Sequence, residues 1–433
     1  MRERSGCGIL DQKKVKTGWD GADMNEKLRT DAEAIVRAAI TSVLPDRAVE
    51  RALAGMEFPG RVWLVAAGKA AWQMSRAAVD CLRLPLAGGV CVTKYGHVPG
   101  PIEGILCMEA GHPVPDENSF RATGRVLELT ADLTERDTVL FLLSGGGSAL
   151  FEKPLIEGEE LQRITDQLLA CGADIVKINT GRKRLSAVKG GKFAQWCAPA
   201  RVEAVVLSDV LGDPPDMIAS GPAAADSSTC ADALAVVREY GLNLSERAFE
   251  CLNTETPKTL GNVRTQIIGS VRQLCAAAEA ECRKRGYETV FLTDQLSCEA
   301  REAGRFLASI ARSHGGSGRK LAFLAGGETV VHLTGCGLGG RNQEIALGAA
   351  EGLAGLGAGG ISGGADGTDG PTDAAGGYAD GDTLAQLTAQ GISLSDVLRN
   401  NDAYHALKAV DGLIFTGPTG TNVNDVAVVL VER

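Results

Sequence analysis

The sequence predicts a two-domain α/β protein, and three observations support this fold class. The chain has 433 residues, which is more than one ordinary hydrophobic core accommodates. Short apolar runs of strand length alternate with amphipathic helical segments along most of the chain. This pattern changes at 254–265, where we expect the connection between the domains. We therefore place the first domain at 24–260 and the second at 261–433.

In the first domain, helical patterning begins near Met24, and strands then alternate with helices. The expected elements are, in order, a helix at 25–44, a strand at 62–67, a helix at 70–82, a strand at 89–94, a helix at 119–131, a strand at 138–143, a helix at 159–176 and a strand at 202–207. This order and these lengths are typical of a largely parallel sheet covered by helices.

The second domain shows the same alternation and is expected to form a second α/β unit. Its expected elements are a helix at 270–285, a strand at 288–293, a helix at 298–313, strands at 321–324 and 329–333, a helix at 342–354 and a final strand at 426–431. A glycine-rich region separates the middle strands from the last one, and we expect its loops to be shaped around a ligand.

Composition excludes several classes of protein. The formal net charge is -10, so neither nucleic acid nor an anionic membrane is an expected partner. Residues 1–23 are polar and lack the apolar core of a signal peptide, so we expect a disordered extension there. The 12 cysteines are scattered without a C-x-x-C pair, which is typical of reduced thiols in a cytoplasmic protein.

Two candidate anion-binding loops follow strands of the first domain. Lys69 comes directly after a strand and opens a helix, where free N–H groups already favour anions. Ser144, Gly145, Gly146, Gly147 and Ser148 form a second loop between a strand and a helix. Glycines there can turn successive N–H groups toward a phosphate or a carboxylate.

Charged residues elsewhere extend these candidates. The stretch 177–192 contains Lys189 among six cations, and in an acidic chain it is expected to attract anions. Asp209 follows the strand at 202–207, where it can hold Mg²⁺ or accept a proton from a hydroxyl. An aspartate that caps the next helix is the competing interpretation.

In the second domain, Arg341 and Asn342 lie where a glycine loop meets a helix. A guanidinium at that point can bind phosphate oxygens and stabilise a phosphoryl-transfer transition state. Glu328, Asp366 and Asn424 lie in further polar loops that suit a hard metal ion or substrate hydroxyls. An alternative comes from residues 335–340, which match G-x-G-x-x-G and would favour an NAD(P)-dependent dehydrogenase. No acidic residue ends a recognisable second strand about 20 residues further on, as such a site requires.

Several longer stretches closely resemble the glycerate 2-kinase family, the glycerate kinases with a MOFRL-type C-terminal domain. The matching segments cover most of residues 27–431 and read VAAGKAA at 65–71, EAGHPVPDEN at 109–118, LLSGGGSAL at 142–150, KINTGRKRLSAVKGGK at 177–192, LSDVLGDPPDMIASGP at 207–222, GGRNQEIALGAA at 339–350, DGTDGPTDAAGG at 366–377 and FTGPTGTNVND at 415–425. Gly181, Arg184 and Pro214 depart from the family's usual residues.

The resemblance implies a Rossmann-like N-terminal domain, a smaller C-terminal domain and an active site in the cleft between them. It also implies transfer of the γ-phosphoryl group of ATP to the 2-hydroxyl of D-glycerate, with Mg²⁺. The family's important lysine and arginine map to Lys69 and Arg341. We expect Asp209 to be the metal ligand or the base, with Asp366 and Glu328 as further metal ligands.

The resemblance leaves two questions open. Some relatives carry the label of an NAD(P)H-dependent hydroxypyruvate reductase, which stays as the alternative function. A homodimer is compatible with the sequence but is not indicated by any motif.

Overall fold

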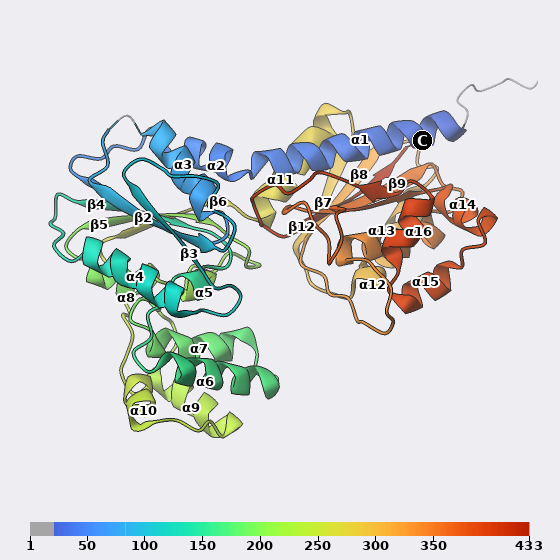
Figure 1. Cartoon of the computed structure of the whole chain (residues 1–433). Helices are drawn as coiled ribbons and strands as arrows, with labels where there is room; N and C mark the ends of the chain where they lie inside the picture. The colour runs from blue at the N-terminus through green and yellow to red at the C-terminus, as the bar shows by residue number, and fades with distance from the viewer. Residues whose placement is uncertain (1–20, 83, 433) are drawn as a thin grey trace, which may run out of the picture.

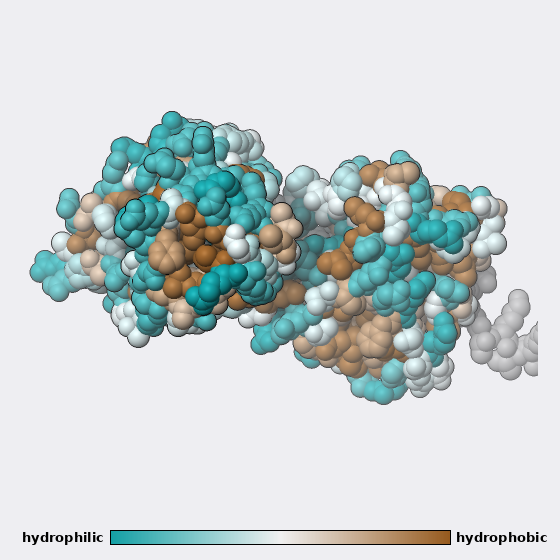
Figure 2. Space-filling view, turned by 90° about the horizontal axis from the view of Figure 1, so that it is seen from below, coloured by the Kyte–Doolittle hydropathy of each residue, from teal (hydrophilic) through white to brown (hydrophobic). Residues whose placement is uncertain are grey.

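The computed structural model describes residues 21–82 and 84–432, which form two lobes, each built around a six-stranded sheet (Figure 1). Residues 1–20 of the expected extension lie outside the described residues, whereas Gly21 already begins helix α1 (Gly21–Ser42). No helix in the described ranges is long and apolar enough to cross a membrane. Seen from below, hydrophobic patches interrupt the hydrophilic surface of both lobes (Figure 2).

The sheet of the first lobe is parallel throughout, as expected, and its strand order is β3-β2-β1-β4-β5-β6. The strands are β1 (Val62–Ala67), β2 (Gly88–Lys94), β3 (Ile105–Ala110), β4 (Thr138–Leu143), β5 (Arg201–Leu207) and β6 (Val263–Gly269). All residues of the central strand β4 are buried, because helices cover both faces of a parallel sheet. This order is the one of dinucleotide-binding folds and has its switch point between β1 and β4.

Two hydrophobic clusters hold helices against the two faces of this sheet. On one face lie α2 (Pro45–Leu53) and α3 (Ala71–Cys81), and on the other lie α4 (Glu117–Leu129) and α8 (Lys192–Trp196). The short helix α5 (Gly147–Leu150) follows β4 directly. A separate helical bundle lies below the sheet in Figure 1. It has its own hydrophobic core and consists of α6 (Gly158–Ala170), α7 (Ile175–Leu185), α9 (Cys230–Tyr240) and α10 (Glu246–Leu252).

The helix expected at 159–176 is two helices in the structure. Helix α6 ends at Ala170, and Gly172 then takes a φ of 72°, which is the left-handed conformation that stops a helix. The Asp174 side chain accepts a hydrogen bond from the Lys177 amide and caps α7. A C-terminal glycine and a new N-cap within a few residues therefore divide the amphipathic stretch.

The second sheet is mixed, with the strand order β11-β10-β9-β12-β8-β7. Its strands are β7 (Glu288–Leu296), β8 (Leu321–Gly327), β9 (Ala358–Gly364), β10 (Gly376–Asp380), β11 (Leu413–Ile414) and β12 (Asp425–Val431). The strand expected at 329–333 does not form, because the chain leaves the sheet at Gly327, whose φ is 154°. Only Val330 makes an isolated bridge, to Glu299. The sequence does not predict β9 and β10 as strands, because both are rich in glycine, which has a low strand propensity.

The helices of the second lobe are α11 (Val271–Lys284), α12 (Ala300–His314), α13 (Arg341–Leu353), α14 (Thr383–Ala389), α15 (Leu394–Asn400) and α16 (Ala403–Ala409). Helix α1 lies across the same lobe (Figure 1) and packs against α11, β9 and β12. The expected boundary at 260 therefore differs from the structure at two places. The apolar face of α1 is buried on the second sheet, and β6, beyond residue 260, forms the edge of the first sheet.

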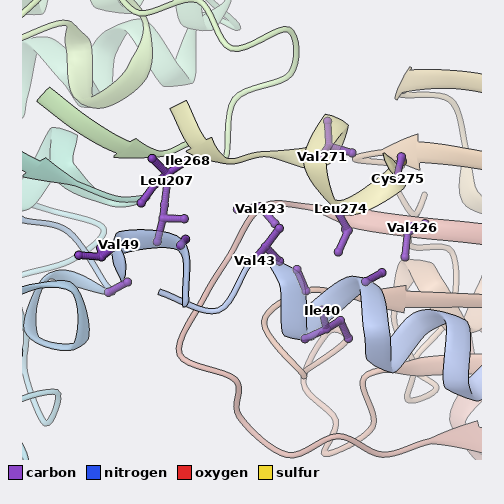
Figure 3. Packing of buried hydrophobic residues seen from close by; sticks show 14 of the residues in the cluster. Ile40, Val43, Val49, Leu207, Ile268, Val271, Leu274, Cys275, Val423 and Val426 are labelled. Carbon is purple, nitrogen blue, oxygen red and sulfur yellow. The ribbon is translucent and has the colours of Figure 1, made fainter. Parts of the chain in front are cut away.

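The lobes share a hydrophobic core where the chain passes between them (Figure 3). The chain crosses once from α1 to α2 and once from β6 to α11. Ile40 and Val43 at the end of α1, Leu207 of β5, and Leu274 of α11 belong to one buried cluster. Val423, just before β12, joins the same cluster. Because residues of both lobes pack together at this junction, it determines which side of each lobe faces the site.

Candidate active site

Polar loops meet at the switch point of the first sheet, where β1 and β4 end side by side. The Lys69 amide donates to the Gly145 carbonyl oxygen at 2.8 Å, and the Ala70 amide donates to Ser144 Oγ at 3.0 Å. Gly68 has a φ of 130°, and a β-carbon there would lie 2.2 Å from Ser144 Oγ. Only glycine permits this contact, so the two loops expected to bind anions lie against each other.

Three glycines in the Ser144–Ser148 loop let other side chains approach the backbone closely. A β-carbon on Gly145 would lie 2.2 Å from Asp209 Oδ2, and one on Gly147 would lie 2.7 Å from the Ala219 β-carbon. At Gly146 it would meet the ring of His112 at 2.9 Å. The glycines therefore bring Asp209 and His112 into contact with the loop, in addition to shaping it.

This part of the site has unused capacity to bind an anion. Within the described ranges, the amides of Gly145, Gly146 and Ser148 donate to no partner. The same ranges contain no carboxylate in an ion pair with Lys69 or with Lys94, which ends β2. Free amides and unpaired ammonium groups together form a binding site for phosphate or carboxylate oxygens.

The basic stretch 177–192 does not form the anion-attracting surface that its charge suggested. Lys183 pairs with Asp216 and Asp226, and Arg184 pairs with Asp226 and Glu255. The remaining four cations also bond within the protein. Lys177 pairs with Glu239, Arg182 donates to the Ser148 carbonyl, Lys189 pairs with Glu152, and Lys192 donates to the carbonyls of Arg184 and Ser186.

Lys189, expected to bind a ligand, lies fully buried behind the glycine loop. Its Nζ donates to the carbonyl oxygens of Ser148 at 2.8 Å and Phe151 at 3.0 Å, and lies 3.4 Å from a carboxylate oxygen of Glu152. Burial lowers the pKa of Lys189 to about 8. Its position indicates that it holds the backbone of the loop, without contact to a ligand.

We expect Lys189→Met to lower the free energy of unfolding by about 3–5 kcal/mol, because the buried Glu152 carboxylate then loses its partner. The measurement is urea unfolding followed by circular dichroism. Lys177→Met is the matched control, since Lys177 pairs with Glu239 near the surface, and such pairs contribute at most about 1 kcal/mol. Equal effects of the two substitutions would contradict the structural role of Lys189.

In the second lobe, Arg341 opens α13 and is held by two carboxylates. Its Nε lies 2.6 Å from Asp425 Oδ2, its Nη2 lies 3.2 Å from Asp425 Oδ1, and its Nη1 lies 2.8 Å from Glu328 Oε1. Burial raises the pKa of Asp425 to about 6 even though Arg341 opposes that shift. Burial disfavours the charge on Arg341, but Asp425 and Glu328 outweigh it and raise the pKa of the guanidinium.

Asp209 lies where the two lobes meet. The Asn424 Nδ2 donates to the Asp209 carbonyl oxygen at 3.1 Å, and Asn424 holds a strained φ of 68°. Burial raises the pKa of the Asp209 carboxyl, Glu328 raises it further, and Lys69 opposes both. Asp209 therefore lies within electrostatic reach of Lys69 from one lobe and of Glu328 from the other.

Two other expected site residues have roles inside the second lobe. Asn342 is buried, its amide donates to Asp369 at 3.1 Å, and its Oδ1 accepts from Ser362 at 2.6 Å. Asp366 accepts from the Thr368 amide within its own turn. Among the described residues, no three His, Cys, Asp or Glu side chains are grouped to hold a metal ion, so Asp209, Asp366 and Glu328 do not form a common cage.

The G-x-G-x-x-G loop at 335–340 has few amides left for a dinucleotide. The Thr334 and Gly335 amides donate to Asn401 Oδ1, and the Leu338 amide donates to Asp402 Oδ1. The Gly337 amide donates to the Asn400 carbonyl oxygen. A Rossmann pyrophosphate site needs free amides at this position.

Two residues of this site, His112 and Lys94, were not among the candidates predicted from the sequence. Ligands of a parallel sheet bind at the carboxyl ends of its strands. Because β2 and β3 are parallel neighbours, Lys94 at the end of β2 and His112 just after β3 lie at that edge. The available signal for His112 was a polar residue two positions after an apolar run. The sequence predicts that the loop at 419–425, which ends with Asp425, offers carboxylates and amides to a metal ion or to substrate hydroxyls. The ion pair between Asp425 and Arg341 was not predicted, because it depends on a contact between segments that are far apart in the chain.

Comparisons with known proteins agree with this geometry. The domain family described as a domain of unknown function (DUF4147) matches residues 31–253, and the MOFRL family matches residues 321–425. A D-glycerate 2-kinase from Thermotoga maritima is 53% identical over 413 residues, which cover 94% of this chain and 99% of that protein. The crystal structure of a glycerate kinase from the same organism superposes with a TM-score of 0.91 at 52% identity, and covers 94% of this chain and 100% of its own.

A protein from Agrobacterium vitis, for which hydroxypyruvate reductase is a provisional name, is 39% identical over 450 residues. The aligned region covers all of both chains. The D-glycerate 2-kinase from Thermotoga maritima, at 53% identity, is therefore more similar to this chain than this protein is.

Proposed function

Because the chain belongs to the glycerate kinase family that has a MOFRL C-terminal domain, we propose that it transfers the γ-phosphoryl group of ATP to the 2-hydroxyl of D-glycerate. The product would be 2-phosphoglycerate. The observation that supports this most is that cations without an ion-pair partner among the described residues, and free amides of the first lobe, lie near Asp209, with Glu328 and Arg341 on the other side of the lobe junction. Phosphoryl transfer depends mainly on alignment and on neutralising the charge of the transferring group.

The residues present fit an ATP phosphate group. The free amides of the Ser144–Ser148 loop, with Lys69 and Lys94, offer donors and positive charge to one anionic ligand. This ligand is either a nucleotide phosphate or the carboxylate of glycerate. Lys69 and Arg341 come from different lobes, and we propose that they bind the transferring phosphoryl group from two sides.

The residues also fit Mg²⁺ in the form that kinases commonly use. Mg²⁺ is usually held by one or two carboxylates together with water and substrate phosphates, and does not need an all-protein cage. The partly buried Asp209 carboxylate, which Glu328 repels, would be stabilised by a cation. When bound, Mg²⁺ would neutralise phosphate charge. We assign Asp209 as its ligand, with Glu328 or Asp366 contributing through water.

The reductase alternative has less support from the geometry. A nicotinamide dinucleotide needs free amides at its glycine loop, whereas Asn400, Asn401 and Asp402 occupy the amides at 334–338. We further propose small anions as the ligands, without nucleic acid or membrane, because the net charge is -10. The scattered cysteines, with every described one free, support the cytoplasm as the proposed location.

The test is ³¹P NMR of the purified protein with ATP, Mg²⁺ and D-glycerate. We expect a metal-dependent signal of 2-phosphoglycerate, and chelation with EDTA should abolish it. A signal of 3-phosphoglycerate would refute the assigned position of transfer. Intact ATP together with hydroxypyruvate-dependent consumption of NADH would replace the kinase proposal with the reductase.

A further inference from the structure

His112 lies against the glycine loop at the point where an anionic ligand would bind. It follows β3 by two residues, and a β-carbon on Gly146 would lie 2.9 Å from its Cδ2 and 3.0 Å from its Nε2. The same β-carbon would lie 3.2 Å from Cγ of Lys69. The imidazole and the Lys69 side chain therefore flank one glycine, whose amide has no partner in the described ranges.

No hydrogen bond among the described residues gives the His112 imidazole a structural role. The described ranges contain no partner for either ring nitrogen, although the side chain is partly buried. Two other histidines provide a contrast. His314 Nδ1 bonds to the Ile310 carbonyl oxygen at 2.9 Å, and His405 Nδ1 bonds to Asp402 at 2.6 Å. A ring beside free amides and without a partner is available to a ligand.

The surroundings favour the neutral imidazole. Burial lowers the pKa of His112, and the positive charges of Lys69 and Lys94 lower it further. On the other side of the loop, Asp209 contacts Gly145 and would oppose this effect, but it faces Lys69. A neutral ring nitrogen at pH 7 can accept a proton, whereas the Lys69 ammonium cannot.

We propose that His112 is the proton acceptor for the substrate hydroxyl in the kinase reaction, an inference that rests on the proposed function. The hydroxyl oxygen forms a bond to the γ-phosphorus, and its proton moves to the free ring nitrogen of His112. The bond from the γ-phosphorus to the oxygen that bridges it to the β-phosphate breaks, and ADP leaves with that electron pair. Asp209 is then free to serve as the metal ligand, so one group does not need two roles.

The experiment compares kcat and KM of the full-length wild type with those of His112→Ala and His112→Asn at several pH values. General base catalysis contributes about 100-fold to 10,000-fold, so we expect kcat to fall by at least about 100-fold in both variants. The KM for ATP should change little. In the wild type, kcat/KM, which reports the groups of the free enzyme, should rise with pH through a pKa below 6.5, the ordinary value for histidine, and this acidic limb should be absent from both variants. Added imidazole should restore part of the activity of His112→Ala but none of that of His112→Asn.

His405→Ala is the matched control, because His405 is exposed on α16 and its ring bonds to Asp402, away from the glycine loop at 144–148. Wild-type kcat in His112→Asn would overturn the assignment, since asparagine cannot accept the proton. A loss of activity with an unchanged pH profile and no imidazole rescue would also overturn it, and would reduce His112 to a packing residue. A wild type without turnover of ATP and glycerate would refute the proposed function and this assignment with it.

Discussion

Lys69→Ala is expected to lower kcat by roughly two to three orders of magnitude, which is the usual effect of removing one charge contact to a transition state. The reason is that Lys69 stands at the switch point beside the free amides of the glycine loop, and its ammonium has no ion-pair partner in the part of the chain that the structure describes. Its backbone amide still bonds to Gly145 in the variant. The thermal midpoint should therefore stay near that of the wild type, because no internal ion pair is lost.

The measurement is ADP release in a coupled assay, together with thermal unfolding. Lys69→Arg keeps the charge but changes the shape of the donor, and it should recover only part of the activity. Lys177→Ala removes a cation of the same lobe that pairs with Glu239, and it should turn over like the wild type. If Lys69→Ala kept more than about a tenth of wild-type kcat, the ammonium would not contact the transferring group.

The strands that carry the first lobe's site could be predicted from the sequence because their periodicity is local. The apolar runs at 62–67 and 138–143 are buried on both faces, so they stand out without tertiary information. Because carboxyl ends of parallel strands share one edge, Lys69 and Ser144 could be placed together. In the structure the two loops contact each other through the Lys69 amide, which donates to the Gly145 carbonyl oxygen.

The rest depended on contacts between segments that are far apart in the chain. Lys189 and Asn342 carry side chains that suit ligand binding, yet burial turns both inward to satisfy backbone and carboxylate groups of the protein. Whether a cation faces solvent or a carbonyl depends on packing, which a charge count does not report. Helix α1 joins the second lobe for the same reason, since its apolar face can be buried equally well on either sheet.

Arg341→Met should have the second large effect, a fall in kcat of roughly two to three orders of magnitude, and it should also destabilise the protein. In the structure Asp425 and Glu328 bind three of the guanidinium nitrogens. An arginine has five N–H donors, so two remain for phosphate oxygens. Removing the side chain also leaves Asp425 buried without its partner, which costs about 3–5 kcal/mol.

The loss of unfolding free energy in Arg341→Met should depend on pH, because it leaves the carboxyl group of Asp425 without its partner. Burial raises the pKa of Asp425 to about 6 in the wild type, and the loss of Arg341 would raise it further. The native state of Arg341→Met then binds a proton that the unfolded chain, with an ordinary aspartate, releases. Its deficit in unfolding free energy relative to the wild type should therefore grow as the pH rises through and above 6, and shrink toward pH 4.

A double substitution separates the structural role of Arg341 from the catalytic one. Arg341→Met with Asp425→Asn removes the buried carboxylate as well as its partner, so unfolding free energy near pH 7 should return most of the way to the wild-type value. The kcat should stay low, because no donor remains for the transferring phosphoryl group. Asp425→Asn alone is the matched control and should keep more activity than the double variant. If the double variant regained wild-type kcat, Arg341 would serve only to neutralise Asp425, and the two-sided contact with Lys69 would have to be abandoned.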